Sequence, residues 1–517
     1  MSSFAGGTAL ACWRARPVFP TASLTQRESR KKVVVVGSGW AGLGAAHHLC
    51  KQGFDVTVLE GGYELGPKTN VPIRGFWYPY RNIFNLIDEL GVEPFTNWAK
   101  SAQYSDKGLE VEYPIFGELP QLPTPFGTLL NTKFARLPSI DRLTSLPLMA
   151  ALIDFDNTDD AWRKYDSITA REICKQFGCS DQLFQDIFDP LLQVGLFAPS
   201  EQCSAAAALG MLYYYVLANQ KNFDFVLCRG LVREKIFQPW IETMRSRGCR
   251  FLEGRKVTEL VLDDETGCVS EVICGKESFK TDAVVLAVGI STLQEIVQGS
   301  AVLSAREEFL KAMKLHTVDL VTVKLWLDRK VSIPYASNVA SGLDGAYGWT
   351  FHDLNRIYDE HKDSASTIIQ ADLYNVNDLL PLKDEILVEK VMSWLSKCAK
   401  NIGGASVVDR EIGRFPKYLP RFAPGTYKYA MQGKTSFSNL FMAGDWIVNR
   451  HGSWAEEKAY VSGVEAANRV VDCLQEGGLA RIVAVEDDEM HIQTLRDFNR
   501  NLQEIISQFP LSNYFLH

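Results

Sequence analysis

The stretch KKVVVVGSGWAGLGAAHHLCKQGFDVTVLE, from Lys31 to Glu60, decides the fold of this chain. Four consecutive valines predict a buried strand, and a glycine-rich turn follows them directly. Apolar residues then recur at helical spacing, and a second apolar run, Val56 to Leu59, ends at Glu60. The order strand, tight turn, helix and strand is typical of a β-α-β unit in a parallel α/β sheet.

The turn has the spacing Gly-x-Gly-x-x-Gly, which is typical of dinucleotide-binding folds. Its first glycine permits a sharp exit from the strand, the second lets the backbone approach a pyrophosphate, and the third lets the helix pack closely on the sheet. The helix N-terminus then offers free N–H groups to phosphate oxygens. The predicted phosphate-binding residues are Gly37, Ser38, Gly39, Trp40, Ala41 and Gly42.

Glu60, eighteen residues after Gly42, is placed to accept hydrogen bonds from the hydroxyl groups of an adenosine ribose. A carboxylate there would repel a 2′-phosphate, which disfavours NADP. An ordinary β-α-β turn without a ligand is the alternative interpretation. The combination of strand, helix and terminal acid in the right order favours a nucleotide.

Composition describes a globular protein with a large core and excludes several classes of site. The 517 residues suit two or three domains, with 46% hydrophobic and 22% charged residues. A net charge of −8 gives no reason to expect nucleic acid as a partner. The eleven cysteines and eight histidines show neither a zinc-binding spacing nor a disulfide framework, which indicates a reducing compartment.

Residues 1–30 differ in kind from the rest of the chain. They are rich in Ser, Thr and Ala, and carry four arginines against the single acid Glu28. This composition predicts a disordered transit peptide for a chloroplast or other plastid, with a mitochondrion as the alternative. A plain disordered tail would have a similar composition.

No apolar run reaches the roughly 18 residues that span a bilayer. The strongest candidate, Cys203 to Ala218, contains three tyrosines and predicts a buried helix. Peripheral membrane contact stays open.

Two later stretches return to the first β-α-β unit. Gly248 to Gly289 alternates apolar and polar residues through three short strands, which predicts a β-meander that ends in a buried strand at Gly289. Asn439 to Leu474 predicts a buried strand that ends at Gly444 and Asp445, followed by an amphipathic helix. A carboxylate at the carboxyl end of a parallel strand lies where such sheets bind ligands.

The domain organisation follows from these returns. We expect a Rossmann-type FAD-binding domain, with a parallel sheet plus a β-meander, built discontinuously from residues 31–110, 225–300 and 436–475. Residues 111–224 and 301–435 would form an inserted α+β substrate domain, because they contain no second Gly-x-Gly-x-x-Gly. Residues 476–517 predict a C-terminal helical extension, with apolar positions at Leu495, Phe498, Leu502, Ile505 and Phe509.

These motifs resemble the FAD-containing amine oxidoreductase superfamily, and within it the plant and cyanobacterial phytoene and ζ-carotene desaturases. The resemblance covers roughly Val33 to Leu474. It rests on the glycine-rich turn with Glu60 and on several blocks of sequence, which are NIFNLIDELGV (Asn82 to Val92), RGLVREKIFQPWIETMRSRGCRFLEGRKVTEL (Arg229 to Leu260), VTVKLWLDRKV (Val321 to Val331) and FMAGDW followed by AEEKAYVSG.

The resemblance implies a non-covalent FAD. Glu60 would bind the adenosine ribose, Val257 would contact the adenine through its backbone, and Asp445 would bind the ribityl and pyrophosphate region. A single nucleotide fold with a returning Gly-Asp strand also suits one long FAD better than a diffusible nicotinamide. Further candidate cofactor contacts are Gly61, Lys68, Gly289, Gly444 and Glu457, the last standing in the place of a family glutamate.

The chain departs from the family pattern near the expected flavin. The family's Gly-Gly-Arg turn is altered, with Gly62 in the arginine position and Pro67 in the place of the second glycine. The segment before RGFWYPY is about a dozen residues shorter than in the desaturases. Lys458 replaces a family glycine, which is expected to crowd the approach to the flavin ring.

Carotene-type desaturation needs a flavin and a long apolar channel, with little acid-base apparatus. Candidate walls are aromatic clusters, which would otherwise be plain core: Phe76, Trp77, Tyr78, Tyr80, Tyr213 to Tyr215, Phe223 and Phe225. Arg74 and Arg81 flank the first cluster and could lie near the flavin, although a solvated or ion-paired arginine is the more ordinary role. No catalytic residue is assigned.

Four functions stay open at this point. A plastid desaturase that abstracts hydride from an apolar carotenoid or isoprenoid substrate is favoured, and the resemblance implies a quinone acceptor. A flavin amine oxidase is less favoured, because the strand expected to carry its lysine has Leu320 and Val321 there, with Lys324 displaced. An isomerase of the same fold, or a non-catalytic flavoprotein scaffold, completes the set.

Overall fold

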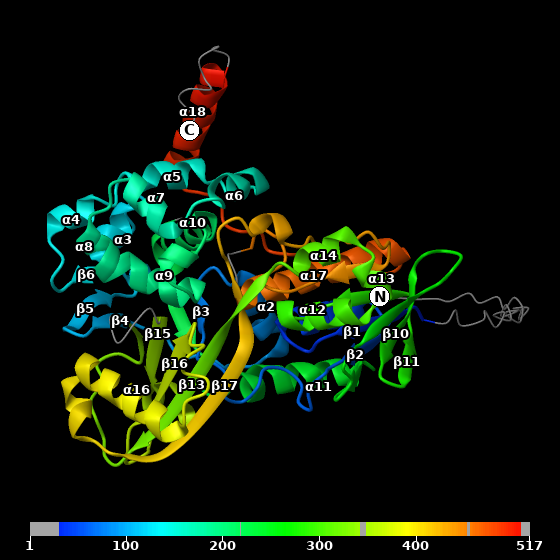
Figure 1. The fold of residues 1–517 in the computed structure, drawn as a ribbon, viewed down its shortest axis with the longest axis horizontal. Helices are drawn as coiled ribbons and strands as arrows, with labels where there is room; N and C mark the ends of the chain where they lie inside the picture. The colour runs from blue at the N-terminus through cyan, green and yellow to red at the C-terminus, as the bar shows by residue number, and fades with distance from the viewer. Residues whose placement is uncertain (1–29, 218, 342–347, 452–454, 508–517) are drawn as a thin grey trace, which may run out of the picture. The chain divides into compact units, whose positions relative to one another are not determined.

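The stretch Lys31 to Glu60 forms the centre of a five-stranded parallel sheet with the strand order β18-β12-β1-β2-β8 (Figure 1). The four valines of β1 are at most 4% exposed, because helices cover one face of this sheet and a smaller sheet covers the other. Since all five strands run parallel, their carboxyl ends share one edge. The strands are β1 (Lys32–Val36), β2 (Asp55–Leu59), β8 (Arg250–Leu252), β12 (Ala283–Leu286) and β18 (Leu440–Met442).

In this computed structural model, the described residues are 30–217, 219–341, 348–451 and 455–507. The predicted transit peptide therefore lies outside them except for Arg30, as do the C-terminal Phe509 and the side chain of Ile505. The described cysteines are free, and most of them are buried. Among the described residues, no helix combines the length and the hydropathy needed to cross a bilayer.

Helices α1 and α17 pack together on one face of the parallel sheet. Their approach is so close that a Cβ atom on Gly463 of α17 would lie 2.0 Å from the main-chain oxygen of Ala41 in α1. The opposite face carries the predicted β-meander, which is antiparallel in the order β11-β10-β9, together with helices α12 to α14. The meander strands are β9 (Glu259–Leu262), β10 (Val269–Cys274) and β11 (Glu277–Lys280).

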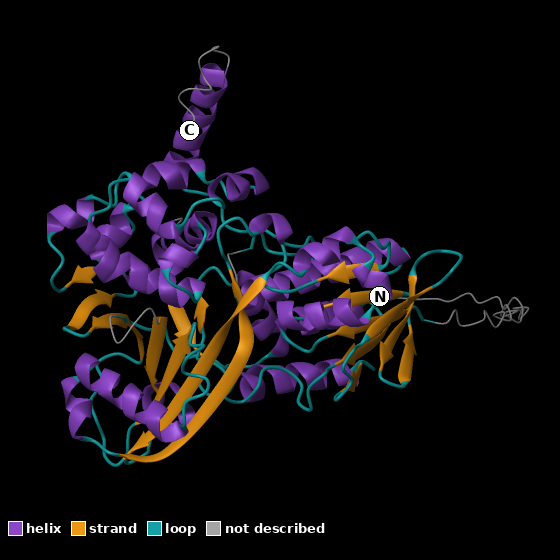
Figure 2. Cartoon of the chain, in the orientation of Figure 1, coloured by secondary structure: helices purple, strands orange, loops and turns teal. Residues whose placement is uncertain are grey.

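A second, eight-stranded sheet has the order β17-β13-β16-β15-β14-β4-β5-β6 and is antiparallel except where β14 meets β4. Its strands are among those drawn in orange in Figure 2. Helix α16 covers one of its faces with a core that includes Trp349, Trp394 and Leu387. Helix α9 lies against the other face at β14 and β15. The strands are β4 (Ser101–Ser105), β5 (Gly108–Tyr113), β6 (Lys133–Phe134), β13 (His316–Leu327), β14 (Ser337–Ala340), β15 (Gly348–Asp353), β16 (Ile368–Tyr374) and β17 (Val407–Arg421).

A short antiparallel pair, β3 (Gly75–Trp77) and β7 (Phe225–Leu227), joins the two aromatic clusters of the sequence. The helices complete the fold. They are α1 (Trp40–Lys51), α2 (Arg81–Leu90), α3 (Phe126–Asn131), α4 (Ser139–Leu143), α5 (Leu148–Asp154), α6 (Asp159–Tyr165), α7 (Ala170–Gln176), α8 (Asp181–Leu183), α9 (Asp189–Leu196), α10 (Ala205–Met211), α11 (Gln238–Ser246), α12 (Ile290–Gly299), α13 (Ala301–Ser304), α14 (Glu307–Ala312), α15 (Leu354–Ile357), α16 (Asp384–Cys398), α17 (Glu456–Leu474) and α18 (Met490–Ser507).

The sheets correct the predicted domain boundary at residue 110. Strand β4 and the first part of β5 fall within the range assigned to the FAD-binding domain, yet both belong to the eight-stranded sheet. Both sheets lie in one compact unit that starts at Lys31. The mixed helical and sheet content predicted for the insertions is confirmed. Cys203 to Tyr215 is buried as predicted, except for the half-buried Tyr213, and the predicted end at Ala218 lies outside the described residues.

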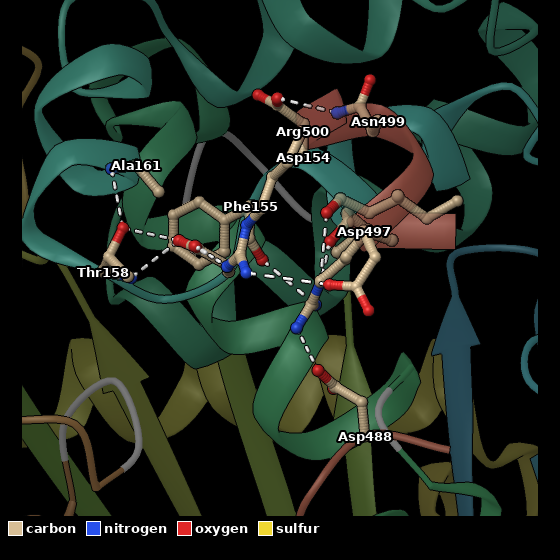
Figure 3. A network of polar contacts seen from close by, with 12 residues as sticks. Asp154, Phe155, Thr158, Ala161, Asp488, Asp497, Asn499 and Arg500 are labelled. Atoms are coloured by element: carbon tan, nitrogen blue, oxygen red, sulfur yellow. Dashed lines mark hydrogen bonds and ion pairs between the residues drawn. The ribbon is translucent and has the colours of Figure 1, made fainter. Parts of the chain in front are cut away.

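The C-terminal helix α18 is anchored by polar contacts rather than by its apolar stripe (Figure 3). Arg500 donates to Asp156 at 2.7 Å, and Asn499 donates to Asp154 at 3.2 Å. The buried guanidinium of Arg496 donates to the main-chain oxygens of Ile153, Leu152 and Phe155. In contrast, Leu495, Phe498 and Leu502 are 43%, 61% and 39% exposed. Helix α18 therefore contacts the rest of the protein through polar groups, while these three apolar residues are exposed.

Candidate functional site

A cavity of about 330 Å³ lies at the carboxyl edge of the parallel sheet. Its lining joins residues from the ends of β1, β12 and β18 with the segment that leads to Arg74. The cavity therefore lies at the carboxyl edge of the sheet, which is where parallel α/β sheets bind ligands. Six residues predicted to bind the cofactor line it, namely Gly39, Trp40, Ala41, Gly289, Gly444 and Asp445.

The three glycines of the turn have different tasks. Gly37 has a φ of +104°, and a Cβ atom there would lie 2.3 Å from the oxygen of Ala287. A Cβ atom on Gly42 would lie 1.9 Å from the oxygen of Gly37, so both glycines are required by packing. A Cβ atom on Gly39 would meet nothing within 4 Å. Gly39 therefore opens onto free space at the start of α1, whose first amides have no side-chain cap.

Glu60 is held at the end of β2 by three main-chain and side-chain donors. Its Oε2 accepts hydrogen bonds from the Ser38 amide at 3.0 Å and the Ser38 hydroxyl at 2.6 Å, and its Oε1 accepts one from the Gly62 amide at 2.8 Å. These contacts orient the carboxylate beside the glycine-rich turn. Ser38 is thus a positioning residue for Glu60 as well as part of the turn.

Val257 lies close to Glu60, because the nearby Arg255 amide donates to the Glu60 main-chain oxygen at 2.7 Å, but Val257 does not line the 330 Å³ cavity. Its side chain is buried, but its main-chain N–H and C=O make no hydrogen bond to any residue that the structure describes. Buried main-chain groups are almost always paired, so this open pair suits a ligand with both a donor and an acceptor, such as the edge of an adenine. Gly61 lies against the neighbouring Lys256, with its Cβ position 3.6 Å from the Lys256 Cα.

The two predicted carboxylates lie on the same edge of the sheet. Strand β2, which precedes Glu60, is separated from β18, which precedes Asp445, by β1 and β12. At about 4.8 Å for each of the three steps, the strand ends are about 14 Å apart. This separation requires an extended ligand if one molecule is to reach both residues.

The residues present fit FAD. An open Gly39, an uncapped helix N-terminus and the unpaired main chain of Val257 are the three features that a dinucleotide would complete. Glu60 would hold the adenosine ribose, and Asp445 would hold the ribityl end. These assignments of individual residues stay predictions.

Asp445 lies in a charged environment. Burial raises the pKa of its carboxyl group, and the cations of Lys458 and Arg74 oppose that rise. Burial also lowers the pKa of Lys458 to about 8, against the opposing effect of Asp445. Lys458 lines an adjacent hollow of about 160 Å³ rather than the 330 Å³ cavity. Lys458 was expected to crowd the approach to the flavin ring. In this structure its side chain lies outside the 330 Å³ cavity and does not narrow it.

Glu457 does not face the groove. Its fully buried carboxylate accepts hydrogen bonds from the Asn82 amide at 2.9 Å, the Asn82 side chain at 2.7 Å and the Ile83 amide at 3.0 Å. It therefore binds the N-terminal amides of α2, which has no side-chain cap of its own. These contacts do not support the predicted role in cofactor binding. Its neighbour Glu456 lines the cavity instead.

Lys68 also lies beside the groove rather than in it. Its ammonium group is 5.6 Å from the centre of the Phe415 ring, and the residue lines a separate, small hollow next to Pro67 and Arg233. The predicted contact of Lys68 with the cofactor is therefore not supported by its position.

A second cavity of about 290 Å³ adjoins the first. The two share Trp40, Arg74, Leu419, Asp445, Glu456 and Ala459 as walls. The aromatic clusters of the sequence converge on the second cavity, with the Trp77 ring 4.9 Å from Phe225, 5.2 Å from Phe223 and 5.2 Å from Tyr215. An apolar ligand in this cavity would therefore lie next to the cofactor groove.

Arg74 is the principal residue that the site prediction left out. It lines both cavities, lies 3.8 Å from Glu456 and stacks 5.2 Å from the centre of the Phe197 ring. The segment before it is tied to β16 by the hydrogen bond from the Ile73 amide to Asp372, at 2.9 Å. Its place beside an aromatic cluster was the only signal in the sequence. Arg81, the other flanking arginine, instead forms an ion pair with Glu486.

A methyl group at Gly39 tests the groove. We expect Gly39→Ala to raise the dissociation constant of FAD at least tenfold, because the methyl group would occupy the space left for the pyrophosphate. Unfolding of the apoprotein in urea should change by less than about 1 kcal/mol, since that methyl group meets no protein atom. Gly404→Ala is the matched control, as its Cβ position is equally open. Unchanged FAD affinity in Gly39→Ala would contradict this placement.

Burial raises the pKa of Glu457 to about 7 from a usual value of 4.5, despite the donors from Asn82. Because the folded chain binds this proton more tightly than the unfolded chain, the stability contributed by Glu457 is fully present below pH 4.5 and is lost as the pH rises through 7. The difference in unfolding free energy between the natural protein and Glu457→Gln should therefore fall by up to about 3 kcal/mol across this window. Urea unfolding at several pH values measures it, and a constant difference would refute the assignment.

Comparisons with known proteins agree with this geometry. The family described as flavin containing amine oxidoreductase matches residues 40–471. The chain is 23% identical over 469 residues to a 15-cis-phytoene desaturase of Synechococcus elongatus, covering 85% of this chain and 96% of that protein. It is 23% identical over 470 residues to the chloroplastic/chromoplastic 15-cis-phytoene desaturase of Narcissus pseudonarcissus, covering 86% and 80%.

Among solved structures, the fold is similar to cyclohexylamine oxidase from Brevibacterium oxydans, with a TM-score of 0.66 at 13% identity over 87% of this chain and 100% of that one. The family match covers most residues of both sheets and of both cavities, but it starts at Trp40, after β1 and the first two glycines of the turn. The chain belongs to the flavin containing amine oxidoreductase family and is an FAD-dependent oxidoreductase.

Proposed function

We propose that this oxidoreductase desaturates an elongated apolar molecule of the isoprenoid or carotenoid class. The observation that carries the proposal is the aromatic cavity of about 290 Å³, which shares six wall residues with the cofactor groove. When bound, FAD supplies the capacity to accept a hydride from carbon. The resemblance to phytoene desaturases supports the substrate class.

The residues around the cavity would position and enclose the substrate. Trp77, Tyr80, Phe223 and Phe225 supply flat apolar walls, which suit a conjugated or branched hydrocarbon chain. Water would be excluded from the shared wall by Trp40 and Leu419. Desaturation transfers a hydride to FAD and releases a proton from the neighbouring carbon as the double bond forms.

Amine oxidation is the second candidate, and the fold of cyclohexylamine oxidase is the observation in its favour. The position of Lys324 argues against it. Its ammonium group lies 4.9 Å from the Trp326 ring and 5.9 Å from the Tyr358 ring, and the residue lines neither cavity.

Substitution in the aromatic cavity tests the proposal. Val194 of α9 lines this cavity, so Val194→Trp should fill it and abolish conversion of carotenoid precursors while FAD stays bound. Val388→Trp on α16, similarly half-buried but against the opposite face of the eight-stranded sheet, is the matched control. Cells that accumulate phytoene or ζ-carotene report the activity through new conjugated double bonds.

The same preparation separates the candidate functions. Release of peroxide from polyamines or aromatic amines, with carotenes untouched, would favour amine oxidation instead. Interconversion of double-bond geometry without net oxidation would indicate an isomerase. Flavin absorbance without turnover of any substrate would indicate a non-catalytic flavoprotein scaffold. A colourless protein that fails to bind added FAD would contradict all four functions.

We further propose that the protein works in a plastid, at a membrane surface that supplies the apolar substrate and a quinone acceptor. Exposed apolar side chains on two successive short helices support the surface contact. On α3, Phe126 and Leu130 are 49% and 70% exposed, and on α4, Ile140 and Leu143 are 70% and 54% exposed. Isolated exposed apolar residues are common, but four in two short helices suit insertion into lipid.

Vesicle binding tests the surface contact. The double variant Leu130→Ser/Ile140→Ser should lower co-sedimentation with galactolipid vesicles at least about threefold, because each change removes apolar area that would enter the bilayer. Leu310→Ser/Ile386→Ser is the control, since those residues are 49% and 44% exposed on α14 and α16. Equal binding by the two double variants would refute a role for α3 and α4.

A further inference from the structure

The aromatic cavity has a polar floor on the eight-stranded sheet. Ser101 of β4 pairs with Ser337 of β14, which pairs in turn with His352 of β15. Residues directly opposite one another across neighbouring strands point to the same face. All three line the cavity, so they form one row across it, which we call the polar row. Its neighbours in sequence, such as Ala102 and Phe351, point into the core under α16.

Other polar groups on this face are already satisfied. Gln103 accepts from the Tyr113 hydroxyl at 3.0 Å, and Gln370 donates to the Val71 oxygen at 3.1 Å. Asp372 accepts from the Ile73 amide and from Gln370. Gln370 and Asp372 thereby hold the segment before Arg74, whereas Gln103 joins β4 to Tyr113 of β5.

The polar row differs because two hydroxyl groups and one imidazole nitrogen in it have no hydrogen-bond partner among the described residues. The hydroxyl groups of Ser101 and Ser337 make no hydrogen bond to a described residue. His352 is 3% exposed; its Nε2 lies 3.1 Å from the Thr350 hydroxyl and 3.6 Å from Asp372, but its Nδ1 has no partner. A buried polar group without a partner costs about 1–3 kcal/mol. A pure hydrocarbon in this cavity would leave that cost in place.

The polar row carries no charge. Burial, together with the nearby Arg74, lowers the pKa of His352 to about 3, so its imidazole is neutral. Two hydroxyl groups and a neutral imidazole cannot compensate an ionised ligand group, whose burial without a partner is costly. They are well suited to an oxygen atom that both donates and accepts hydrogen bonds, or that only accepts them.

We propose that Ser101, Ser337 and His352 bind an uncharged oxygen function, a hydroxyl or carbonyl group, at one end of an otherwise apolar substrate. This inference rests on the proposed function and narrows it, because the substrate becomes an oxygenated isoprenoid rather than a plain hydrocarbon. The aromatic walls would contact the carbon chain of the substrate. The polar row would determine which end of the substrate enters the cavity and how deeply it is inserted.

Binding of matched C15 probes to the FAD-loaded full chain tests the proposal. Farnesol, farnesal, farnesene and farnesylamine share a carbon skeleton and differ in the terminal group. Trp40 and Trp77 line the cavity, so quenching of tryptophan fluorescence reports binding. We expect farnesol or farnesal to bind at least about tenfold more tightly than farnesene. A preference between the two identifies a hydroxyl or a carbonyl group.

Variants of the polar row give the second arm. Ser101→Ala/Ser337→Ala should raise the dissociation constant of the oxygenated probe about tenfold and leave that of farnesene unchanged. Ser300→Ala is the control, because the Ser300 hydroxyl likewise has no partner among the described residues but lies between α12 and α13, away from the cavity. His352→Leu, checked for folding by its retained FAD, should have the same selective effect as the double variant.

The outcomes separate this inference from the proposed function. Equal affinity for farnesol, farnesal and farnesene would overturn the inference while an apolar substrate stands. Failure of every probe to bind would overturn both. Tightest binding of farnesylamine would overturn the inference and favour amine oxidation.

Discussion

The close packing of α1 against α17 is the contact on which the site depends. Gly463 meets the main chain of Ala41, and a Cβ atom on Gly44 would lie 2.9 Å from the oxygen of Tyr460, so the two helices approach at their backbones. Because α1 begins at the glycine-rich turn and α17 begins beside Asp445, this contact brings the two ends of the chain's nucleotide unit together. A larger side chain at either glycine would separate the halves of the groove.

The start of α17 divides its acidic residues between structure and site. Glu457 binds the amides of α2, whereas Glu456 turns to the shared wall of the two cavities and to Arg74. Adjacent residues at a helix start point in different directions, so one carboxylate supports the fold while the next faces the ligand space. Arg74 in turn depends on the second sheet, since Asp372 of β16 holds the preceding amide.

The two cavities suit an enzyme in which the cofactor carries out the redox chemistry and the protein positions and encloses the substrate. The family match establishes a flavin-dependent oxidoreductase. Within that family, the location of Lys324 outside both cavities and the aromatic walls of the second cavity favour an apolar substrate over an amine. The neutral polar row adds a feature that a plain hydrocarbon would not use.

Much of the fold followed from the sequence. The valine run, the glycine spacing and Glu60 determined the β-α-β unit and its carboxyl edge, because local periodicity and turn geometry are encoded by neighbouring residues. The apolar strand before Gly444 and Asp445 likewise determined the return to the same sheet. The alternation of apolar and polar residues predicted the β-meander. These features depend on short segments whose pattern has one dominant structural interpretation.

Only the tertiary structure decided which side chains face the ligand space. Glu456 rather than Glu457 lines the groove, Lys68 and Lys458 lie beside it, and Arg74 joins both cavities. The polar row also has no sequence signal, since Ser101, Ser337 and His352 are far apart along the chain and meet only through strand register. The physical reason is that orientation and cross-strand pairing depend on long-range packing, which local periodicity does not encode.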